Sequence, residues 1–559
     1  MLRFRVPTIA TFVAQYDGMK KLLLLSALLL NLGSYAQNER PKLVVGIVVD
    51  QMRFDYLYKY WNRYGNEGLK RMINEGYQCK NLQFNYVPTY TAPGHAAIYT
   101  GTTPARNGMI ANDWYDRKKG GVMYCTEDPS VATVGAATAK VGKMSPRNML
   151  STTVSDELRI ATNKKGKVIG VSLKDRGAIL PAGHLANAAY WFDGESGNWV
   201  SSTFYMNELP KWLQDFNAKQ SAMTYLKKGW NTLYPIESYT ASLPDKNNYE
   251  TPFKGKLEAT FPYLLDSLMA KNGGQNLIKA TPYGNTFTKD IALAAIDGES
   301  LGKDEITDML CVSFSSTDFV GHQFGPDAIE MEDTYLRFDQ DIADFLKQLD
   351  TKVGKGEYLV FLSADHGGAT VPAYLMDERA PGGYMDYKPM EDSIKSILKQ
   401  KFDANDWFLE IQNDQIYLNE TKIAASKFSL ETVEEYIAEK LIAFDGIHSI
   451  STASRLNKNE YSKGTLHLVQ QGFYGKRSGN VILTLEPNWM EYSKTGTTHG
   501  SPYSYDTRVP MLWYGWKIQK GETVLPYFIN DIAPTVSWLL NIPFPNATSG
   551  NPIPLPINK

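Results

Sequence analysis

Short apolar runs rich in β-branched residues recur along the chain, and stretches with helical periodicity separate them. The clearest runs cover residues 43–49, 168–173, 309–314, 358–362 and 509–514. Runs of this length are typical of strands, and their alternation with helices is typical of a sheet covered by helices. The pattern therefore predicts an α/β fold with a largely parallel central β-sheet and helices on both faces.

Polar side chains that can take part in chemistry directly follow four of these five runs. They are Asp50, the triplet Lys174-Asp175-Arg176, the triplet Ser316-Thr317-Asp318, and the pair Asp365-His366. In open α/β sheets, ligands bind beyond the carboxyl ends of the parallel strands. The sequence thus predicts that these side chains gather at one edge of one sheet.

Two long stretches interrupt the alternation and indicate inserted cap regions. Residues 188–303 are rich in aromatic side chains and poor in strong strand patterns, and a second insertion is expected at about 381–476. We find no internal repeat and no low-complexity linker. We therefore expect one catalytic domain over residues 37–559 that carries both insertions.

The N-terminal residues have the pattern of a targeting segment. Met19-Lys20-Lys21 gives a positive start, residues 22–32 are apolar, and Ser34-Tyr35-Ala36 offers a small-residue cleavage site. This order predicts a bacterial secretory signal peptide that begins at Met19, after an upstream extension over 1–18, and is removed near Ala36. The apolar run is too short to span a bilayer, and no later stretch approaches the ~20 apolar residues that spanning needs. We expect a periplasmic or secreted protein.

The charge balance limits the partners of this protein. The formal net charge of the 559 residues is -2, which disfavours a nucleic-acid binder with a basic footprint. An anionic substrate would therefore need local positive charge from metal ions or from a few Lys and Arg side chains. We expect small-molecule substrates and a monomer.

Cysteines are few, because only Cys79, Cys125 and Cys311 are present. An odd number in an exported protein excludes a disulfide scaffold and allows one bridge at most. Cys311 lies inside an apolar run, so Cys79 and Cys125 are the favoured pair. Metal ligation by cysteine is not expected.

Carboxylates and histidines form the candidate metal site. Three of the seven histidines lie in polar surroundings: His322, four residues after Asp318; His366, beside Asp365; and His499, beside Gly500. With Asp50 they make three Asp and three His, a mixed nitrogen and oxygen set that suits Zn²⁺. Each piece alone is common, since strand-end Asp residues often cap helices. The combination predicts two metal ions.

Thr91 stands just before Ala92-Pro93-Gly94 at a predicted helix start. Its default role is a helix cap, because a Thr side chain there can accept a free backbone N–H and Pro is favoured in the first turn. Thr89, two residues earlier, is a second candidate hydroxyl. Position alone does not separate the capping role from a catalytic one.

Long stretches of the chain resemble the alkaline phosphatase superfamily, and most closely its PafA-type bacterial alkaline phosphatases. The resemblance is carried, in the family's order, by VVGIVVDQMRFDYL, PTYTAPGHAAIYTGTTPARNGMIANDWYD, VSLKDRGAILPAG, SSTDFVGHQFGP, LSADHGG, TTHGSPYSYDTRVPMLWYG and DIAPTVSWLL. It implies an alkaline-phosphatase-like sandwich, an exported phosphatase and two Zn²⁺ per chain.

The resemblance also implies roles for individual residues. Asp318, His322 and His499 would hold one zinc ion, and Asp50, Asp365, His366 and the Thr91 hydroxyl the other. Thr91 would be the nucleophile that accepts the phosphoryl group, and Asn112, Lys174 and Arg176 would contact the phosphoryl oxygens. His95 is expected only to pack or to bond backbone.

The superfamily also contains phosphodiesterases, sulfatases, phosphonate hydrolases and mutases, so the metal site by itself does not identify the substrate class. A sulfatase would need a Cys or Ser within C/S-x-P-x-R, which Thr91-Ala-Pro-Gly-His lacks. If the strand at 168–173 continues, Lys174 and Arg176 point to the same side, where two cations match a phosphate monoester dianion. The alternatives are a nucleotide pyrophosphatase or phosphodiesterase on the same core, a non-catalytic phosphate-binding protein, and a phosphomutase, which fits export poorly.

Overall fold

The computed structural model describes residues 39–558, and the chain divides into two compact units, Met1–Arg40 and Pro41–Lys559. The second unit holds the helices and strands that are described. The expected signal peptide lies outside the described residues. Within the described part, no helix combines the length and the apolar character that a membrane span requires.

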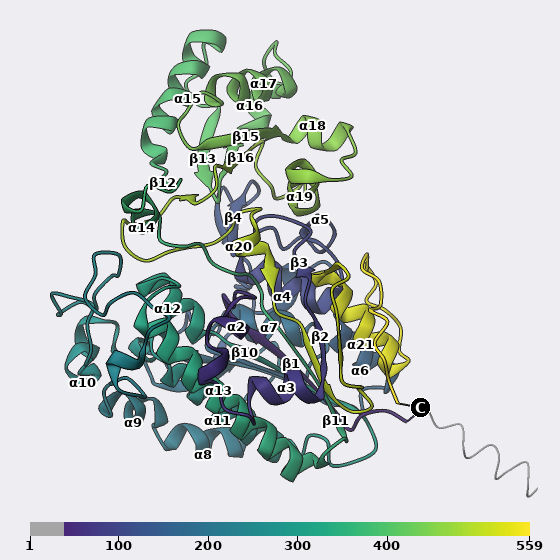
Figure 1. Cartoon of the computed structure of the whole chain (residues 1–559). Helices are drawn as coiled ribbons and strands as arrows, with labels where there is room; N and C mark the ends of the chain where they lie inside the picture. The colour runs from purple at the N-terminus through teal and green to yellow at the C-terminus, as the bar shows by residue number, and fades with distance from the viewer. Residues whose placement is uncertain (1–38, 559) are drawn as a thin grey trace, which may run out of the picture. The chain divides into compact units, whose positions relative to one another are not determined.

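A ten-stranded sheet forms the centre of the second unit (Figure 1). Its five middle strands are parallel and fully buried, as expected for a sheet covered on both faces. In order they are β11 (Tyr358–Ser363), β1 (Leu43–Val49), β10 (Asp308–Phe314), β7 (Val168–Ser172) and β8 (Ala188–Asp193). The predicted α/β fold with a largely parallel central sheet is confirmed.

The outer strands of this sheet include antiparallel pairs. On one side β19 (Leu512–Gly515) pairs with β11 and β2 (Tyr77–Cys79) pairs with β19, while β20 (Gly521–Thr523) runs parallel to β2. On the other side β9 (Asn198–Ser202) and β6 (Thr133–Val134) continue antiparallel from β8.

Helices cover both faces of the sheet. One layer contains α4 (Thr91–Thr100), α6 (Val154–Ala161), α7 (Asp175–Ala182) and α21 (Ile532–Leu540), and the other α11 (Tyr283–Gly298), α12 (Ser316–Phe324) and α13 (Ile329–Leu349) (Figure 1). Because α7 and α11 both contact β7 and β10, the two layers enclose these strands. Apolar side chains of strands and helices form one continuous core.

The first expected insertion begins inside the central sheet. Residues 188–202 form β8 and β9, so the inserted part starts after β9. It contains α8 (Lys211–Ala218), α9 (Ser221–Lys227), α10 (Leu265–Leu268) and a 3₁₀ helix at Gly274–Ala280. Its buried side chains, such as Leu213 and Trp230, belong to the main core. The aromatic-rich sequence of this region therefore fills the core instead of forming only surface.

The second insertion folds around a core of its own and forms the cap, at the top of Figure 1. Its antiparallel sheet has the order β13 (Phe408–Gln412), β14 (Gln415–Leu418), β16 (Val481–Leu485) and β15 (Ile447–Thr452). The helices α15 (Tyr387–Phe402) and α17 (Leu430–Leu441) pack with this sheet. Since β16 is one of its strands, the cap extends past residue 476.

The cap is hydrogen-bonded to a hairpin of the main body, β4 (Asp113–Asp116) and β5 (Gly121–Tyr124). Gln412, the last residue of β13, donates from Nε2 to Asp113 Oδ1 at 2.5 Å, and Asn413, in the turn that follows, donates from Nδ2 to the Asp113 carbonyl at 2.7 Å. These two bonds connect the cap directly to the start of β4.

The prediction of one continuous strand at residues 509–514 is wrong. The structure divides it into β18 (Arg508–Val509), in a separate three-stranded sheet, and β19. Pro510 lies between them and has no N–H to donate to a ladder. The chain therefore changes sheets at this proline.

The favoured disulfide between Cys79 and Cys125 is not formed. All three cysteines are free and buried. Cys79 lies in the main core, and Cys125 packs in a separate apolar cluster with Met109 and Trp114. Burial raises the pKa of the Cys79 thiol to about 12, as expected for an unreactive buried cysteine.

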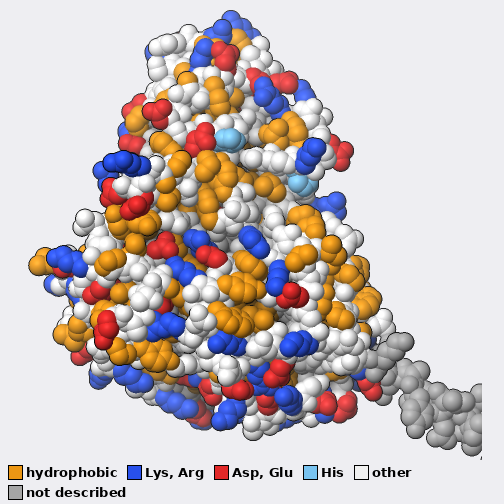
Figure 2. Space-filling model, viewed as in Figure 1, with side chains coloured by type: hydrophobic (Ala, Val, Ile, Leu, Met, Phe, Trp, Pro, Cys, Tyr) orange, Lys and Arg blue, Asp and Glu red, His pale blue; other side chains and the backbone are white. Residues whose placement is uncertain are grey.

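Charges are mixed on the face that Figure 2 shows, where Lys and Arg lie among Asp and Glu without an extended basic area. This agrees with the near-neutral net charge of -2 and gives no electrostatic footprint for nucleic acid on that face.

Two buried carboxyl groups, Glu250 of the first insertion and Glu330 of α13, influence each other. Their exposed fractions are 6% and 0%. Burial, together with the charge of Glu330, raises the pKa of Glu250 to about 10. Burial raises the pKa of Glu330 to about 8, against the effect of its hydrogen bond from Tyr263. Because both groups ionise near pH 4.5 when unfolded, folding takes up protons and stability falls as the pH rises above that value.

We expect Glu250→Gln to stabilise the protein at alkaline pH and to leave it nearly unchanged at pH 5. At pH 9 the substitution removes a charge that folding must neutralise, and the gain should raise Tm by roughly 1–3 °C. Scanning calorimetry at both pH values measures this difference. Glu258→Gln, at an exposed position of the same insertion, is the matched control, and equal shifts at pH 5 and pH 9 would contradict the prediction.

Candidate active site

The predicted polar residues gather where the central parallel strands end. Asp50 follows β1, Lys174 follows β7, Asp318 lies in α12 after β10, and Asp365-His366 follows β11. All five side chains are at least 95% buried. Strands adjacent in the order β11, β1, β10, β7 thus bring together residues separated by up to 316 positions in the chain.

Asp318, His322 and His499 form the first group. As their spacing predicts, Asp318 and His322 lie one turn apart in α12, with 3.2 Å between Asp318 Oδ1 and His322 Nε2. His499 Nε2 lies 3.6 Å from the same oxygen. Two imidazole nitrogens therefore lie beside one carboxylate oxygen.

Asp50, Asp365 and His366 form the second group. His366 Nε2 lies 3.4 Å from Asp50 Oδ1 and 3.5 Å from Asp365 Oδ2. All three atoms are buried without a hydrogen bond of good geometry. Such orphaned polar atoms are rare in proteins because they lose their hydration, and a cation would satisfy them.

The imidazoles are oriented as metal ligands. Each directs Nδ1 at a backbone carbonyl: His322 at Thr497 (2.7 Å), His366 at Gly367 (2.9 Å) and His499 at Thr89 (2.7 Å). Since the carbonyl can only accept, Nδ1 carries a proton, and in the neutral ring Nε2 then has the lone pair that a metal ion needs. This is the usual support for a metal-binding histidine. The donor set of the two groups therefore fits Zn²⁺, with oxygen and nitrogen ligands.

Lys174 lies between the two groups. Its Nζ is 2.6 Å from Asp50 Oδ2 and 2.6 Å from Asp318 Oδ2. Burial and Asp318 would raise the pKa of Asp50, but the charge of Lys174 and the protonated form of His366 outweigh them and hold this pKa at about 2. Burial and repulsion by Asp50 raise the pKa of Asp365. Lys174 thus compensates Asp50 and Asp318 but leaves the negative charge of Asp365 without a comparable partner. A bound metal ion would supply the missing positive charge.

Thr91 is the first residue of α4 and does not cap it. The N-cap position belongs to Tyr90, whose side chain makes no capping bond, and Asn112 Oδ1 accepts the Ala92 N–H at 2.9 Å. The Thr91 hydroxyl is therefore free for other contacts. Gly94 lets this helix start approach the second group, since a Cβ there would lie 2.2 Å from the Asp365 carbonyl oxygen.

Two cations reach the Thr91 hydroxyl. Lys174 Nζ and Arg176 Nη2 each lie 3.5 Å from Thr91 Oγ1. The expected reason, a strand that continues through both residues, is wrong, because β7 ends at Ser172 and Asp175 begins α7. An extended Lys174 followed by the first helical turn brings both side chains to the site.

Tyr124 and Thr126, which the sequence pattern did not predict as site residues, hold Arg176 and its neighbour Asp175 in place. Tyr124 OH accepts from Arg176 Nη1 at 3.0 Å and donates to Asp175 Oδ1 at 2.9 Å, and Thr126 Oγ1 donates to Asp175 Oδ2 at 2.5 Å. Neither residue follows a predicted strand of the central sheet, so no pattern distinguished them.

His95 does more than the expected packing and backbone contact. Its Nδ1 lies 2.9 Å from the Thr91 carbonyl and 3.3 Å from Asp365 Oδ2, and Nε2 lies 2.8 Å from Ser313 Oγ. Thr89 contacts the backbone carbonyl of Ser501 through its hydroxyl, at 3.2 Å.

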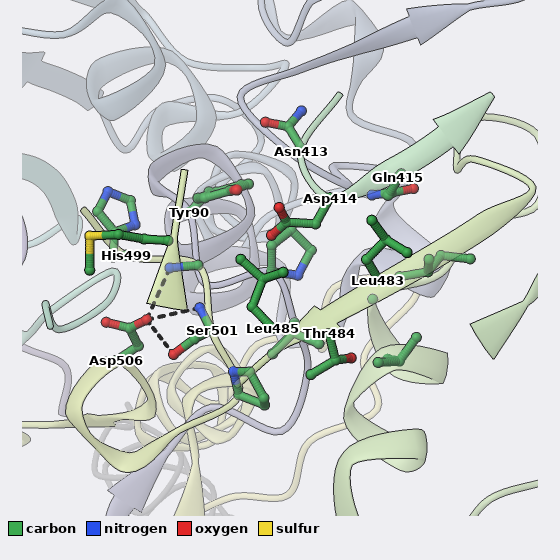
Figure 3. Close-up of a pocket in the computed structure, with 18 of the residues that line it drawn as sticks. Tyr90, Asn413, Asp414, Gln415, Leu483, Thr484, Leu485, His499, Ser501 and Asp506 are labelled. Carbon is green, nitrogen blue, oxygen red and sulfur yellow. Dashed lines mark hydrogen bonds between the residues drawn. The ribbon is translucent and has the colours of Figure 1, made fainter. Parts of the chain in front are cut away.

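A cavity of about 140 Å³ adjoins His499 between the main body and the cap (Figure 3). Its walls include Tyr90 and His499 from the body and Asp414 from the cap. On its border, Asp506 Oδ2 accepts from Gly500 N, Ser501 N and Ser501 Oγ at 2.7–3.0 Å. These bonds, dashed in Figure 3, fix the loop that carries His499.

Known proteins match this chain over most of its length. A family model described as type I phosphodiesterase / nucleotide pyrophosphatase matches residues 44–508. A Myroides odoratus protein named calcium-transporting ATPase is 47% identical over 519 residues, 92% of this chain and 94% of that protein. Alkaline phosphatase PafA of Elizabethkingia meningoseptica is 47% identical over 517 residues, again 92% and 94%.

Two solved structures of alkaline phosphatase PafA also match this chain over most of its length. The crystal structure of wild-type alkaline phosphatase PafA matches with a TM-score of 0.89 at 46% identity, covering 93% of this chain and 99% of that one. A PafA variant with one Thr, one Asn, one Lys and one Arg substituted matches with a TM-score of 0.88 at 46% identity, covering 92% and 98%.

We expect the wild-type protein to bind two zinc ions, and Asp50→Ala and Asp318→Ala to bind one each. Each substitution removes a carboxylate from one group and leaves the other group intact. Equilibrium dialysis against Zn²⁺ followed by elemental analysis measures the stoichiometry. His184→Ala, which changes a half-buried histidine outside both groups, should keep two ions. Two retained ions in Asp50→Ala would contradict the assignment.

Proposed function

We propose that this chain, which belongs to the alkaline phosphatase superfamily and within it to the PafA-type alkaline phosphatases, hydrolyses phosphate monoesters through a phosphothreonine at a two-zinc centre. The observation that carries the proposal is the position of Thr91 Oγ1, 3.5 Å from both Lys174 Nζ and Arg176 Nη2. A hydroxyl released from capping, beside two cations and two groups of metal ligands, is suited to attack a phosphoryl group.

The substituted PafA variant supports these residue roles. Its changed Thr, Asn, Lys and Arg have the same spacing along the chain as Thr91, Asn112, Lys174 and Arg176 have here. We therefore assign the nucleophile to Thr91 and the phosphoryl contacts to the other three.

The first half of the reaction transfers the phosphoryl group to Thr91. Thr91 Oγ1 attacks phosphorus in line, so that the new P–O bond forms as the bond to the leaving alkoxide breaks and the hydroxyl loses its proton. Bound Zn²⁺ supplies Lewis acidity that favours the alkoxide near neutral pH. Asp50, Asp365 and His366 would hold one ion beside Thr91, and Asp318, His322 and His499 would hold the other.

The second half releases phosphate. Water attacks the phosphothreonine, the bond from phosphorus to Thr91 Oγ1 breaks, and the hydroxyl regains a proton. Arg176, oriented by Tyr124, and Lys174 neutralise charge on the equatorial oxygens throughout. Because phosphoryl transfer proceeds through a loose transition state, such positioning and charge compensation supply most of the acceleration.

Monoester specificity follows from the same cations. A monoester dianion carries one more anionic oxygen than a diester, and Lys174 with Arg176 provides two cations at one side of Thr91. The second candidate is a nucleotide pyrophosphatase or phosphodiesterase, which the description of the matching family model favours. Relative turnover of p-nitrophenyl phosphate and bis-p-nitrophenyl phosphate separates the two.

We also propose that the protein is exported, because residues 19–36 have the pattern of a signal peptide. An exported phosphatase would release phosphate from esters outside the cytoplasm.

We expect Thr91→Ala to abolish multiple turnover of p-nitrophenyl phosphate while zinc content stays at two ions. Loss of the covalent step should lower kcat by at least ~10³-fold, since a nucleophile divides one difficult step into two easier ones. Thr91→Ser should retain part of the rate, and Thr89→Ala, the neighbouring hydroxyl, should stay within a few-fold of wild type. Unchanged turnover in zinc-loaded Thr91→Ala would refute the mechanism.

We expect Arg176→Ala to lower kcat/KM for p-nitrophenyl phosphate about 10–100-fold, because a charged hydrogen bond contributes about 1.5–3 kcal/mol. The loss for bis-p-nitrophenyl phosphate should be much smaller, and Lys174→Ala should show the same bias. Arg106→Ala, an exposed arginine, is the control. Equal losses for both substrates, or a wild-type preference for the diester, would favour the phosphodiesterase.

A further inference from the structure

Gln51 lies between the two groups of metal ligands, and none of the roles assigned above involves it. It directly follows Asp50 at the end of β1, the strand that pairs with β10 on one side and with β11 on the other. Those two strands lead to Asp318 and Asp365. The topology therefore places residue 51 between the carboxylates of both groups.

Gln51 bonds to one carboxylate of each group. Its side-chain Nε2 donates to Asp318 Oδ1 at 2.9 Å, and its backbone N–H donates to Asp365 Oδ1 at 3.2 Å. An ionised carboxylate accepts hydrogen bonds at both of its oxygens. These two bonds therefore leave Asp318 Oδ2 and Asp365 Oδ2 available to other partners. Asp318 Oδ1 is also the oxygen nearest to the ring nitrogens of His322 and His499.

The backbone of Gln51 is in the left-handed region, with φ of +62°, although the side chain is only 2% exposed. A residue with a Cβ adopts this conformation only at an energetic cost, because the Cβ comes too close to the following carbonyl oxygen. Such strain persists where the surroundings determine the conformation, and it concentrates at functional sites. Here the conformation is what aims the N–H at one group while the side chain reaches the other.

Two glycines make room for this side chain. A Cβ on Gly321 of α12 would lie 1.8 Å from Gln51 Oε1, and a Cβ on Gly368 would lie 3.1 Å from Gln51 Cγ, Cδ and Oε1. The amide is therefore held between α12, which carries Asp318 and His322, and the loop that follows Asp365-His366. Its position leaves little freedom for either element to shift.

We propose that Gln51 is a positioning residue that couples the two metal groups, holding Asp318 through its side chain and Asp365 through its backbone. The inference rests on the two-zinc centre of the proposed function. Since only the bond to Asp318 depends on the side chain, substitution should weaken zinc binding at the Asp318, His322 and His499 group and largely spare the other group. Loss of such a supporting bond typically lowers metal affinity 10–100-fold.

The experiment titrates Zn²⁺ into metal-free full-length protein in competition with a chromogenic chelator, which yields both dissociation constants. The variants are Gln51→Met, which keeps the length of the side chain without the donor, and Gln51→Gly, which also removes the backbone strain. Gln78→Met is the matched control, because Gln78 is a buried glutamine, 1% exposed, in β2 and outside the site. Asp50→Ala and Asp318→Ala identify which constant belongs to which group.

We expect both Gln51 variants to raise one dissociation constant 10–100-fold, that of the Asp318 group, while Gln78→Met changes neither. Gln51→Gly keeps the outcome readable if Gln51→Met folds poorly. Wild-type affinity at both groups, or an equal loss at both, would overturn the inference. Zinc binding reports on Gln51 even if wild-type protein fails to hydrolyse phosphate monoesters, so the two proposals can fail separately.

Discussion

Three carboxylates, those of Asp50, Asp318 and Asp365, are buried within one site, and their mutual repulsion is the constraint that the surrounding structure has to satisfy. An ionised carboxylate removed from water is costly unless a charge or a cation compensates it. Lys174 reaches two of the three, at 2.6 Å each, and the imidazole nitrogens face all of them. The same arrangement that would bind two divalent cations therefore keeps a free hydroxyl, that of Thr91, in a strongly electrostatic environment.

The sheet supplies the rigidity that this arrangement needs. The parallel strands β11, β1, β10 and β7 are fully buried and end at one edge, so the ligands start from backbone that packing holds in place. The supporting bonds then fix orientation: backbone carbonyls hold each Nδ1, Tyr124 holds Arg176, and Asp506 holds the loop of His499. A site of this kind loses little entropy when it binds substrate or metal.

The cap contributes to the site indirectly. It folds around its own core but is hydrogen-bonded through Gln412 and Asn413 to Asp113, the residue after Asn112. Asn112 in turn caps α4 at Ala92, one residue from the hydroxyl. The cavity beside His499 lies between this cap and the main body. The cap is thus linked by hydrogen bonds to residues that we propose contact the phosphoryl group, and it also forms part of the wall of the cavity beside His499.

Local sequence pattern determined the sheet class, the four central strands β1, β7, β10 and β11, and the residues that follow them. Burial on both faces imposes continuous apolar runs, and ligand chemistry selects Asp and His. Local pattern could not determine what depends on contacts between distant segments. The break at Pro510, the start of the first insertion inside the sheet, the free Cys79 and Cys125, and the release of Thr91 from capping by Asn112 all belong to that class. Gln51 and Tyr124 act through partners up to 314 positions away, and only the folded chain brings such partners within hydrogen-bonding distance.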